Sequence, residues 1–124
     1  MEKLKNSREE SEALYKRMVA SHADAVLKGA TIPYTSLNGH MYSFLSKNGL
    51  VALRLPEIER ISFITKYKTT LVEQYGIVQK EYVVVPDRLL KKTNELKRYF
   101  DISYAYVNQL KPKASAKSKK KNQS

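Results

Sequence analysis

The first segment of the chain carries apolar positions at helical spacing. The positions that recur three or four residues apart are Leu14, Met18, His22 and the pair Ala25–Val26. Such a stripe is typical of the buried face of an amphipathic helix. We therefore expect a helix from Arg8 to Lys28, which Gly29 ends.

Three short runs rich in apolar and aromatic residues follow this helix. They are Ile32–Leu37, His40–Leu45 and Leu50–Leu55. Asn38–Gly39 lies between the first two runs, and Asn-Gly is the strongest short hairpin signal because a type I′ turn needs positive φ at both central residues. The pattern predicts a three-stranded antiparallel meander.

The third of these strands alternates, and a helix follows it. One face carries Val51, Leu53 and Leu55, and the other carries Ala52 and Arg54. This alternation predicts one face that packs on helices and one more polar face. Pro56 suits the first turn of a helix that runs to about Tyr67. Its isoleucines recur every three residues, and we expect Ile58, Ile61 and Ile64 to pack it against the sheet.

Two further strands flank Tyr75–Gly76. They are Leu71–Gln74 and Glu81–Val85, and the second is apolar on both faces, which places it in the interior of the sheet. Pro86 ends it.

The last predicted helix carries a long apolar stripe. Asp87 is expected to cap a short turn through Leu89–Leu90, and Thr93 to cap the longer helix that follows. The stripe consists of Leu96, Phe100, Ser103, Val107 and Leu110. The element order α-β-β-β-α-β-β-α predicts an α+β fold with an antiparallel sheet and helices packed mainly on one face.

Charge divides the chain into two parts. The formal net charge is +11, but six of the 23 basic residues lie between positions 111 and 121, where there is no acidic residue. Residues 1–110 keep 17 basic against 12 acidic residues, a net charge of +5. We expect one domain over residues 1–110 and a disordered, lysine-rich tail over residues 111–124, because the tail has nothing to bury.

Composition excludes several classes of site. The absence of cysteine rules out disulfides, thiolate zinc sites and cysteine nucleophiles. The four glycines lie ten or more residues apart and form no phosphate loop, so we expect no cofactor. With no apolar run of eighteen residues and no secretory signal, we expect a cytoplasmic protein that does not bind membranes.

Several segments together resemble the N-terminal domain of the TfoX/Sxy competence regulators. They are Asn38-Gly39-His40-Met41-Tyr42, Leu53-Arg54-Leu55-Pro56, Lys80-Glu81-Tyr82-Val83-Val84-Val85-Pro86, Leu89-Leu90, Ser103-Tyr104-Ala105-Tyr106-Val107 and Lys111-Pro112-Lys113. The resemblance covers roughly residues 13–113. Ala30-Thr31-Ile32-Pro33 stands where a Met-Phe-Gly-Gly stretch is common in the family.

The resemblance implies a secretion-chaperone-like fold and a role in transcription regulation through an unknown protein partner. Folds of this kind often pair through a sheet or a helix, which leaves a homodimer open. Full-length competence regulators add a second, helical domain, and this sequence has a lysine tract where that domain would begin. The family supplies no catalytic residues.

Candidate catalytic and metal-binding residues are few. His22 lies on the apolar stripe of the first helix without a second ligand at helical spacing, so we expect a partnered core or boundary histidine. His40 is predicted to share a strand face with Tyr42 and Phe44, and catalysis there would need Ser36 or Ser43 and an orienting group. We therefore expect no enzyme.

The alternative to a protein-interaction module is a nucleic-acid-associated protein. The candidate phosphate-binding residues are Lys113, Lys117, Lys119, Lys120 and Lys121, with Arg or Lys on the core adding register. Tyr67 and Tyr99, which are next to basic residues, and Tyr104 and Tyr106, on the last predicted helix, would stack on bases or pack in the core. Closely spaced lysines attract any polyanion, so the tail equally suits a solubilising end.

Overall fold

The computed structural model describes residues 6–29 and 31–112. Within them the helices are α1 (Arg8–Ala20), α2 (Glu57–Tyr67), α3 (Asp87–Leu90) and α4 (Thr93–Asn108). The strands are β1 (Tyr34–Leu37), β2 (His40–Leu45), β3 (Val51–Arg54), β4 (Leu71–Gln74) and β5 (Ile77–Val85). The predicted α+β class is confirmed.

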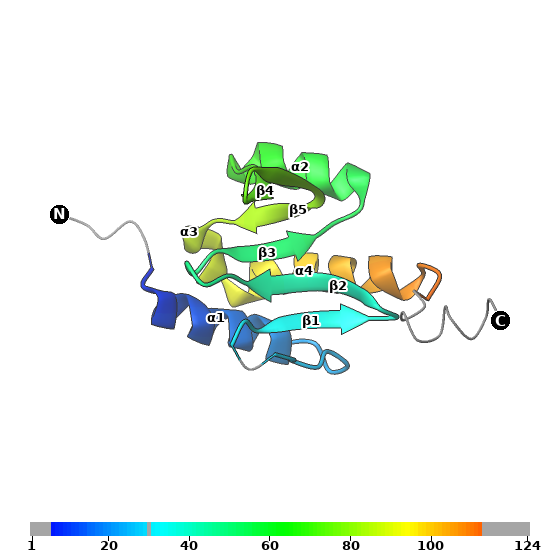
Figure 1. Cartoon of the computed structure of the whole chain (residues 1–124), viewed down its shortest axis with the longest axis horizontal. Helices are drawn as coiled ribbons and strands as arrows, with labels where there is room; N and C mark the ends of the chain where they lie inside the picture. Colours follow the sequence, from blue (N-terminus) through cyan, green and yellow to red (C-terminus); the bar gives the residue numbers. More distant parts are fainter. Residues whose placement is uncertain (1–5, 30, 113–124) are drawn as a thin grey trace.

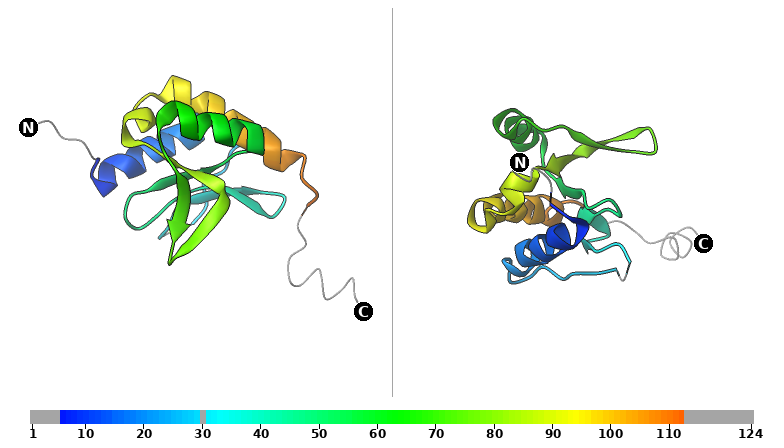
Figure 2. Two further views of the ribbon diagram at one scale, coloured as in Figure 1. Left: turned by 90° about the horizontal axis from the view of Figure 1, so that it is seen from above. Right: turned by 90° about the vertical axis from the view of Figure 1, so that its left-hand side faces the viewer.

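The strands form one open antiparallel sheet in the order β1-β2-β3-β5-β4. The helices gather on one face of this sheet, and no helix of the described residues covers the other face (Figures 1 and 2). β5 lies between β3 and β4, which confirms the interior position predicted from its two apolar faces. We call the two sides the helix face and the open face.

The hairpins follow the predicted turn chemistry. Asn38 and Gly39 have φ of 58° and 82°, so both adopt the left-handed conformation that a type I′ turn requires. Tyr75 and Gly76, between β4 and β5, have φ of 55° and 75°.

A β-bulge in β2 changes which side chains face the helices. Thr35 pairs with Ser43, but Ser36 pairs with Met41, so Tyr42 is an extra residue in β2. Tyr42 and Ser43 both contact the helix side, whereas Phe44 packs on the open face. The prediction that Phe44 shares a face with Tyr42 is therefore wrong, because strict alternation fails at the bulge.

The main core lies between the helices and the sheet. Its largest fully buried side chains include Tyr15, Tyr42, Phe63, Phe100, Met18, Leu45, Leu53 and Leu55. Tyr15 reaches the sheet, where its hydroxyl is 2.7 Å from Ser43 Oγ, which in turn is 2.6 Å from Thr35 Oγ1. This buried chain of hydroxyl groups satisfies its own polar atoms and ties α1 to β1 and β2.

α1 ends at Ala20, well before the predicted end at Lys28. Ser21 Oγ donates to the Met18 carbonyl at 2.6 Å, and the His22 ring accepts the Asp24 N–H at 3.1 Å. These local side-chain bonds replace the helical pattern. The buried positions are Ser11, Tyr15, Met18 and Val19, and Val26 is 62% exposed.

α2 packs mainly through aromatic residues, and of the three predicted isoleucines only Ile64 packs against the core. Phe63 and Tyr67 are its buried residues, whereas Ile58 and Ile61 are 79% and 57% exposed. The predicted burial of Ile58 and Ile61 is wrong. Phe63 and Tyr67 lie four residues apart and so share one face of the helix, and it is this face that is buried. The Phe63 ring lies edge-on to that of Tyr99 from α4, with centroids 5.0 Å apart.

The last helices have the predicted stripe but not the predicted caps. The buried residues of α4 are Leu96, Tyr99, Phe100, Ser103 and Val107. No side-chain hydrogen bond caps α3 or α4. Asp87 instead accepts the backbone N–H of Asn6 at 2.7 Å, and Thr93 is the first residue of α4.

Candidate functional site

The open face carries a second apolar cluster. Phe44, Ala52 and Val72 are buried there, and the side chains packed around them are Tyr34, Met41, Leu50, Tyr82 and Val84. The sequence predicted a more polar face from Ala52 and Arg54 alone. The bulge adds Phe44 and Met41 to this face, which makes it more apolar than predicted.

The β4–β5 hairpin bends out from the sheet and bounds this cluster. Leu71 pairs with Val83, but the next residue, Val72, pairs with Gln79, so β5 has three more residues than β4 at this point. Such an insertion bends and twists the strand that carries it. The hairpin consequently projects away from the helix layer (Figure 2).

A groove lies between this hairpin and the edge of the sheet formed by β1 and β2. Its volume is about 630 Å³. The lining residues are Ile32, Tyr34, Met41, Phe44, Ser46, Lys47, Asn48, Glu73, Gln74, Tyr75 and Gln79. The groove therefore has aromatic and aliphatic side chains, together with amide, hydroxyl and two charged groups.

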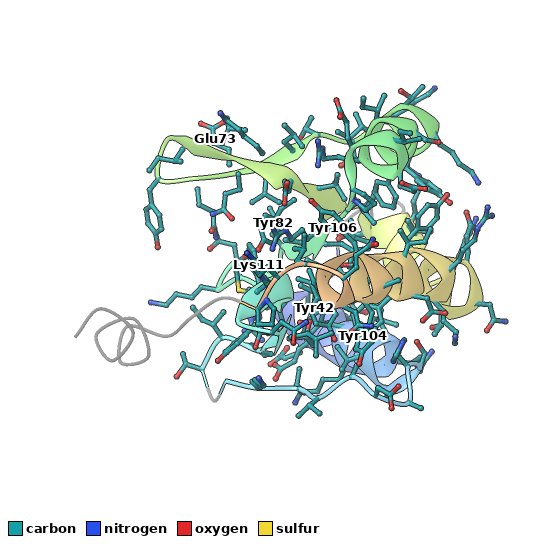
Figure 3. All side chains as sticks on the ribbon, turned by 90° about the vertical axis from the view of Figure 1, so that its right-hand side faces the viewer. Tyr42, Glu73, Tyr82, Tyr104, Tyr106 and Lys111 are labelled. Atoms are coloured by element: carbon teal, nitrogen blue, oxygen red, sulfur yellow. The ribbon has the colours of Figure 1, made fainter. Side chains whose placement is uncertain are left out.

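The polar groups of the groove are partly fixed by neighbours. Gln79 Nε2 donates to Gln74 Oε1 at 3.0 Å across the hairpin. Ser46 Oγ accepts the Leu50 N–H at 3.1 Å and closes the β2–β3 turn, which presents Lys47. Glu73 lies on the hairpin, apart from the tyrosines of the main body (Figure 3). This chemistry can bind a ligand that is apolar in part and polar in part.

Apolar side chains are exposed on the hairpin beside the groove. Tyr75 is 97% exposed, Ile77 67% and Val78 48%. Ile32, which lines the groove, is 40% exposed. Exposed apolar side chains that gather beside a groove are typical of a binding surface.

The two histidines do not assemble a catalytic group within residues 6–29 and 31–112. His40 Nε2 is 2.9 Å from the Lys111 carbonyl. Ser43 is occupied by Tyr15 and Thr35, and Ser36 accepts the Lys28 ammonium at 2.9 Å.

His22 is a partnered boundary histidine, as the sequence predicted. Its ring stacks on Tyr104 with centroids 4.2 Å apart, and its Nε2 is 4.0 Å from Asp101 Oδ1. No group of three or more histidine and acidic residues in the described chain is arranged to hold a metal ion.

Of the residues predicted to contact nucleic acid, the structure describes the tyrosines but not the five lysines. Lys113, Lys117, Lys119, Lys120 and Lys121 lie outside the described residues. Tyr67 and Tyr99 are 8% and 7% exposed, so these two aromatic rings belong to the core.

None of the groove residues was among the site residues predicted from the sequence, although the sequence carries one signal of the groove. Turns between strands are usually polar, whereas Tyr75, Ile77 and Val78 surround the Gly76 turn. Apolar residues at such a turn indicate a surface that something else covers.

Comparisons with protein-family models, curated proteins and solved structures found no match. No helix in the described part of the chain has the length and apolar character needed to cross a membrane.

Proposed function

We propose that this protein is a non-enzymatic interaction module that binds an extended, partly apolar segment of a partner protein in the open-face groove. The observation that carries the proposal is the continuity between the groove and the exposed apolar side chains of the β4–β5 hairpin. A ligand the size of the groove alone would leave Ile77 and Val78 uncovered, because neither lines it. A polypeptide can cover both.

The resemblance to the TfoX/Sxy N-terminal domain supports the same proposal. The order of helices and strands agrees with the secretion-chaperone-like arrangement of that family, with a one-turn helix before the last long one. We propose this finer fold relationship, and with it a partner in transcription regulation, as part of the functional hypothesis.

A random peptide library displayed on phage tests the proposal directly. Selection on the full chain is expected to enrich peptides with an aromatic or aliphatic anchor. In ¹⁵N-labelled protein, an enriched peptide should shift the amide signals of Met41, Phe44 and Gln79. Tyr75→Ser should weaken its binding by about tenfold, since aromatic side chains at interfaces commonly contribute more than 1 kcal/mol.

Ile58→Ser is the matched control for this experiment. Ile58 is as exposed as the hairpin residues, but it lies on α2 and does not line the groove. Its substitution should leave peptide affinity unchanged. Failure to enrich any peptide, or shifts that map to α2 and not to the groove, would reject the proposal.

A second candidate function is nucleic-acid binding through the lysines at positions 111–121. The favouring observation is the local charge, six lysines with no acidic residue among positions 111–124. Replacing Lys113, Lys117, Lys119, Lys120 and Lys121 by glutamine should abolish most of the salt dependence of binding to a labelled single-stranded DNA oligonucleotide. The logarithm of the binding constant falls by about 0.7 per phosphate contact for each decade of salt.

A further inference from the structure

Arg54, the last residue of β3, is held between two tyrosine rings at the end of the sheet. Its guanidinium carbon is 5.9 Å from the ring centroid of Tyr82, on β5, and 5.5 Å from that of Tyr106, on α4. Tyr82, Tyr106 and Lys111 lie close together in the view of Figure 3. The Arg54 side chain is 17% exposed, so its position is fixed while part of it still reaches solvent.

Glu81 and Met41 fix the surroundings of this arginine. Arg54 Nε donates to Glu81 Oε1 at 2.6 Å, and the Tyr106 hydroxyl donates to Glu81 Oε2 at 3.1 Å. The Tyr82 hydroxyl donates to the Met41 carbonyl at 2.5 Å. Although burial alone would raise the pKa of Glu81, the hydrogen bond and charge of Arg54 hold that pKa below its ordinary value. Glu81 is therefore a carboxylate at neutral pH.

The outer edge of the guanidinium remains available. Nε of Arg54 is taken up by Glu81, and the neighbouring Tyr82 hydroxyl bonds the guanidinium and takes up one further N–H at most, which leaves terminal N–H groups for a ligand. Two terminal amino groups in one plane match a pair of phosphate or carboxylate oxygens. Because the arginine is already ordered by its neighbours, it loses little conformational entropy on binding.

The charge around this site favours an anionic polymer. Arg60 adds a positive charge beside Glu81, which leaves the cluster of Arg54, Arg60 and Glu81 with a net positive charge. His40 holds the Lys111 carbonyl at 2.9 Å, so the chain leaves the described structure at this same end. Five lysines follow within nine residues of Pro112, a reach of at most about 30 Å for an extended chain.

We propose that Arg54 binds a backbone phosphate of a nucleic-acid strand, as a fixed contact on the core in addition to the lysines of positions 111–121. The inference rests on the second candidate function above and names its contact on the folded domain. Tyr82 and Tyr106 position the guanidinium, and Glu81 orients it through Nε. The lysines supply attraction that is independent of position, and Arg54 supplies a contact with defined geometry.

The test measures fluorescence anisotropy of a short labelled single-stranded DNA oligonucleotide with the full chain across a salt series. Arg54→Gln should weaken binding by about fivefold to tenfold and reduce the magnitude of the salt slope by about 0.7, the value for one contact to a single strand. Arg98→Gln is the matched control, because Arg98 also lies over a tyrosine, Tyr99 at 5.9 Å, on another helix surface. It should leave affinity and slope unchanged.

Glu81→Gln separates binding from a purely structural role of the ion pair. It removes the carboxylate that orients Arg54 but leaves the guanidinium, so DNA affinity should fall by less than it does in Arg54→Gln, and the salt slope should keep its wild-type value. A loss equal to that of Arg54→Gln would overturn the proposal. Labelled poly-glutamate serves as a phosphate-free polyanion, and an equal effect of Arg54→Gln on its binding would also overturn the phosphate assignment.

The outcomes also distinguish this inference from the function on which it rests. If the lysine-to-glutamine variant loses DNA binding while Arg54→Gln keeps wild-type affinity and slope, the tail binds nucleic acid and the Arg54 site is rejected. If the unaltered chain does not bind the oligonucleotide at all, both proposals fall together.

Discussion

At the scale of single residues, two glycines with the same backbone conformation differ in their surroundings. Gly29 and Gly76 have φ of +86° and +75°, which L residues adopt at a cost of roughly 1–2 kcal/mol. A Cβ on Gly29 would lie 2.3 Å from the Ile32 carbonyl oxygen, whereas a Cβ on Gly76 meets nothing within 4 Å. Only Gly29 is required both for its conformation and for the close approach of another backbone segment.

Substitution by alanine should separate these two requirements. Gly76→Ala is expected to lower the free energy of unfolding by roughly 1–2 kcal/mol, the conformational cost alone. Gly29→Ala should cost about twice that or more, because the backbone around Ile32 must also move. Urea unfolding followed by circular dichroism measures both, and equal effects would contradict the close contact at Gly29.

At the scale of elements, the rotation of α2 about its axis decides which residues stabilise it. Phe63 is fully buried against Tyr67 and Tyr99, while Ile61 is 57% exposed. Phe63→Ala should therefore lower the free energy of unfolding by about 3–5 kcal/mol, since it opens a cavity in the core. Ile61→Ala should change it by no more than about 0.5 kcal/mol.

Thermal and urea unfolding of these two variants test the packing of α2. A larger loss for Ile61→Ala than for Phe63→Ala would support the isoleucine-packed helix predicted from the sequence. If Phe63→Ala does not fold, Phe63→Leu provides a milder cavity for the same comparison. Either result reports on the face of α2 that meets α4 and the sheet.

Local chemistry explains which elements could be predicted from the sequence. The Asn38–Gly39 turn and the two apolar faces of β5 depend on neighbours in sequence, and both predictions are confirmed. The end of α1 and the packing of α2 were mispredicted, because each depends on contacts that spacing alone does not rank. α1 ends where the Ser21 hydroxyl bonds the Met18 carbonyl. The buried face of α2 is the one whose Phe63 ring contacts Tyr99 on α4.

At the scale of the whole molecule, the groove results from two irregularities that no residue pattern specified. The bulge at Tyr42 turns Phe44 to the open face, and the inserted residues of β5 bend the hairpin outward. Both features are set by pairing between strands far apart in sequence. The candidate site could therefore not be predicted from the sequence, although the apolar turn around Gly76 indicated an exposed binding surface.

The whole fold also determines how stability responds to alkaline pH. Burial is the main cause that raises the pKa of Tyr15, Tyr42, Tyr67, Tyr82 and Tyr106. In the unfolded chain a tyrosine releases its proton near pH 10, while in the folded chain these five retain theirs to higher pH. The unfolded state then binds fewer protons, so stability falls as pH rises through and above about 10.

Tyr15 offers the clearest case, because it is fully buried and bonded to Ser43. Its retained proton should lower the free energy of unfolding by up to about 1.4 kcal/mol for each pH unit above 10. Urea unfolding between pH 8 and about pH 11.5 should show this fall, with less of it in Tyr15→Phe and no difference in the surface control Tyr75→Phe. Absorbance at 295 nm should show that the buried tyrosines ionise together with unfolding. A stability that stays constant across this range would mean that the tyrosines ionise within the folded core, and that the packing of α1 on the sheet is looser than the structure has it.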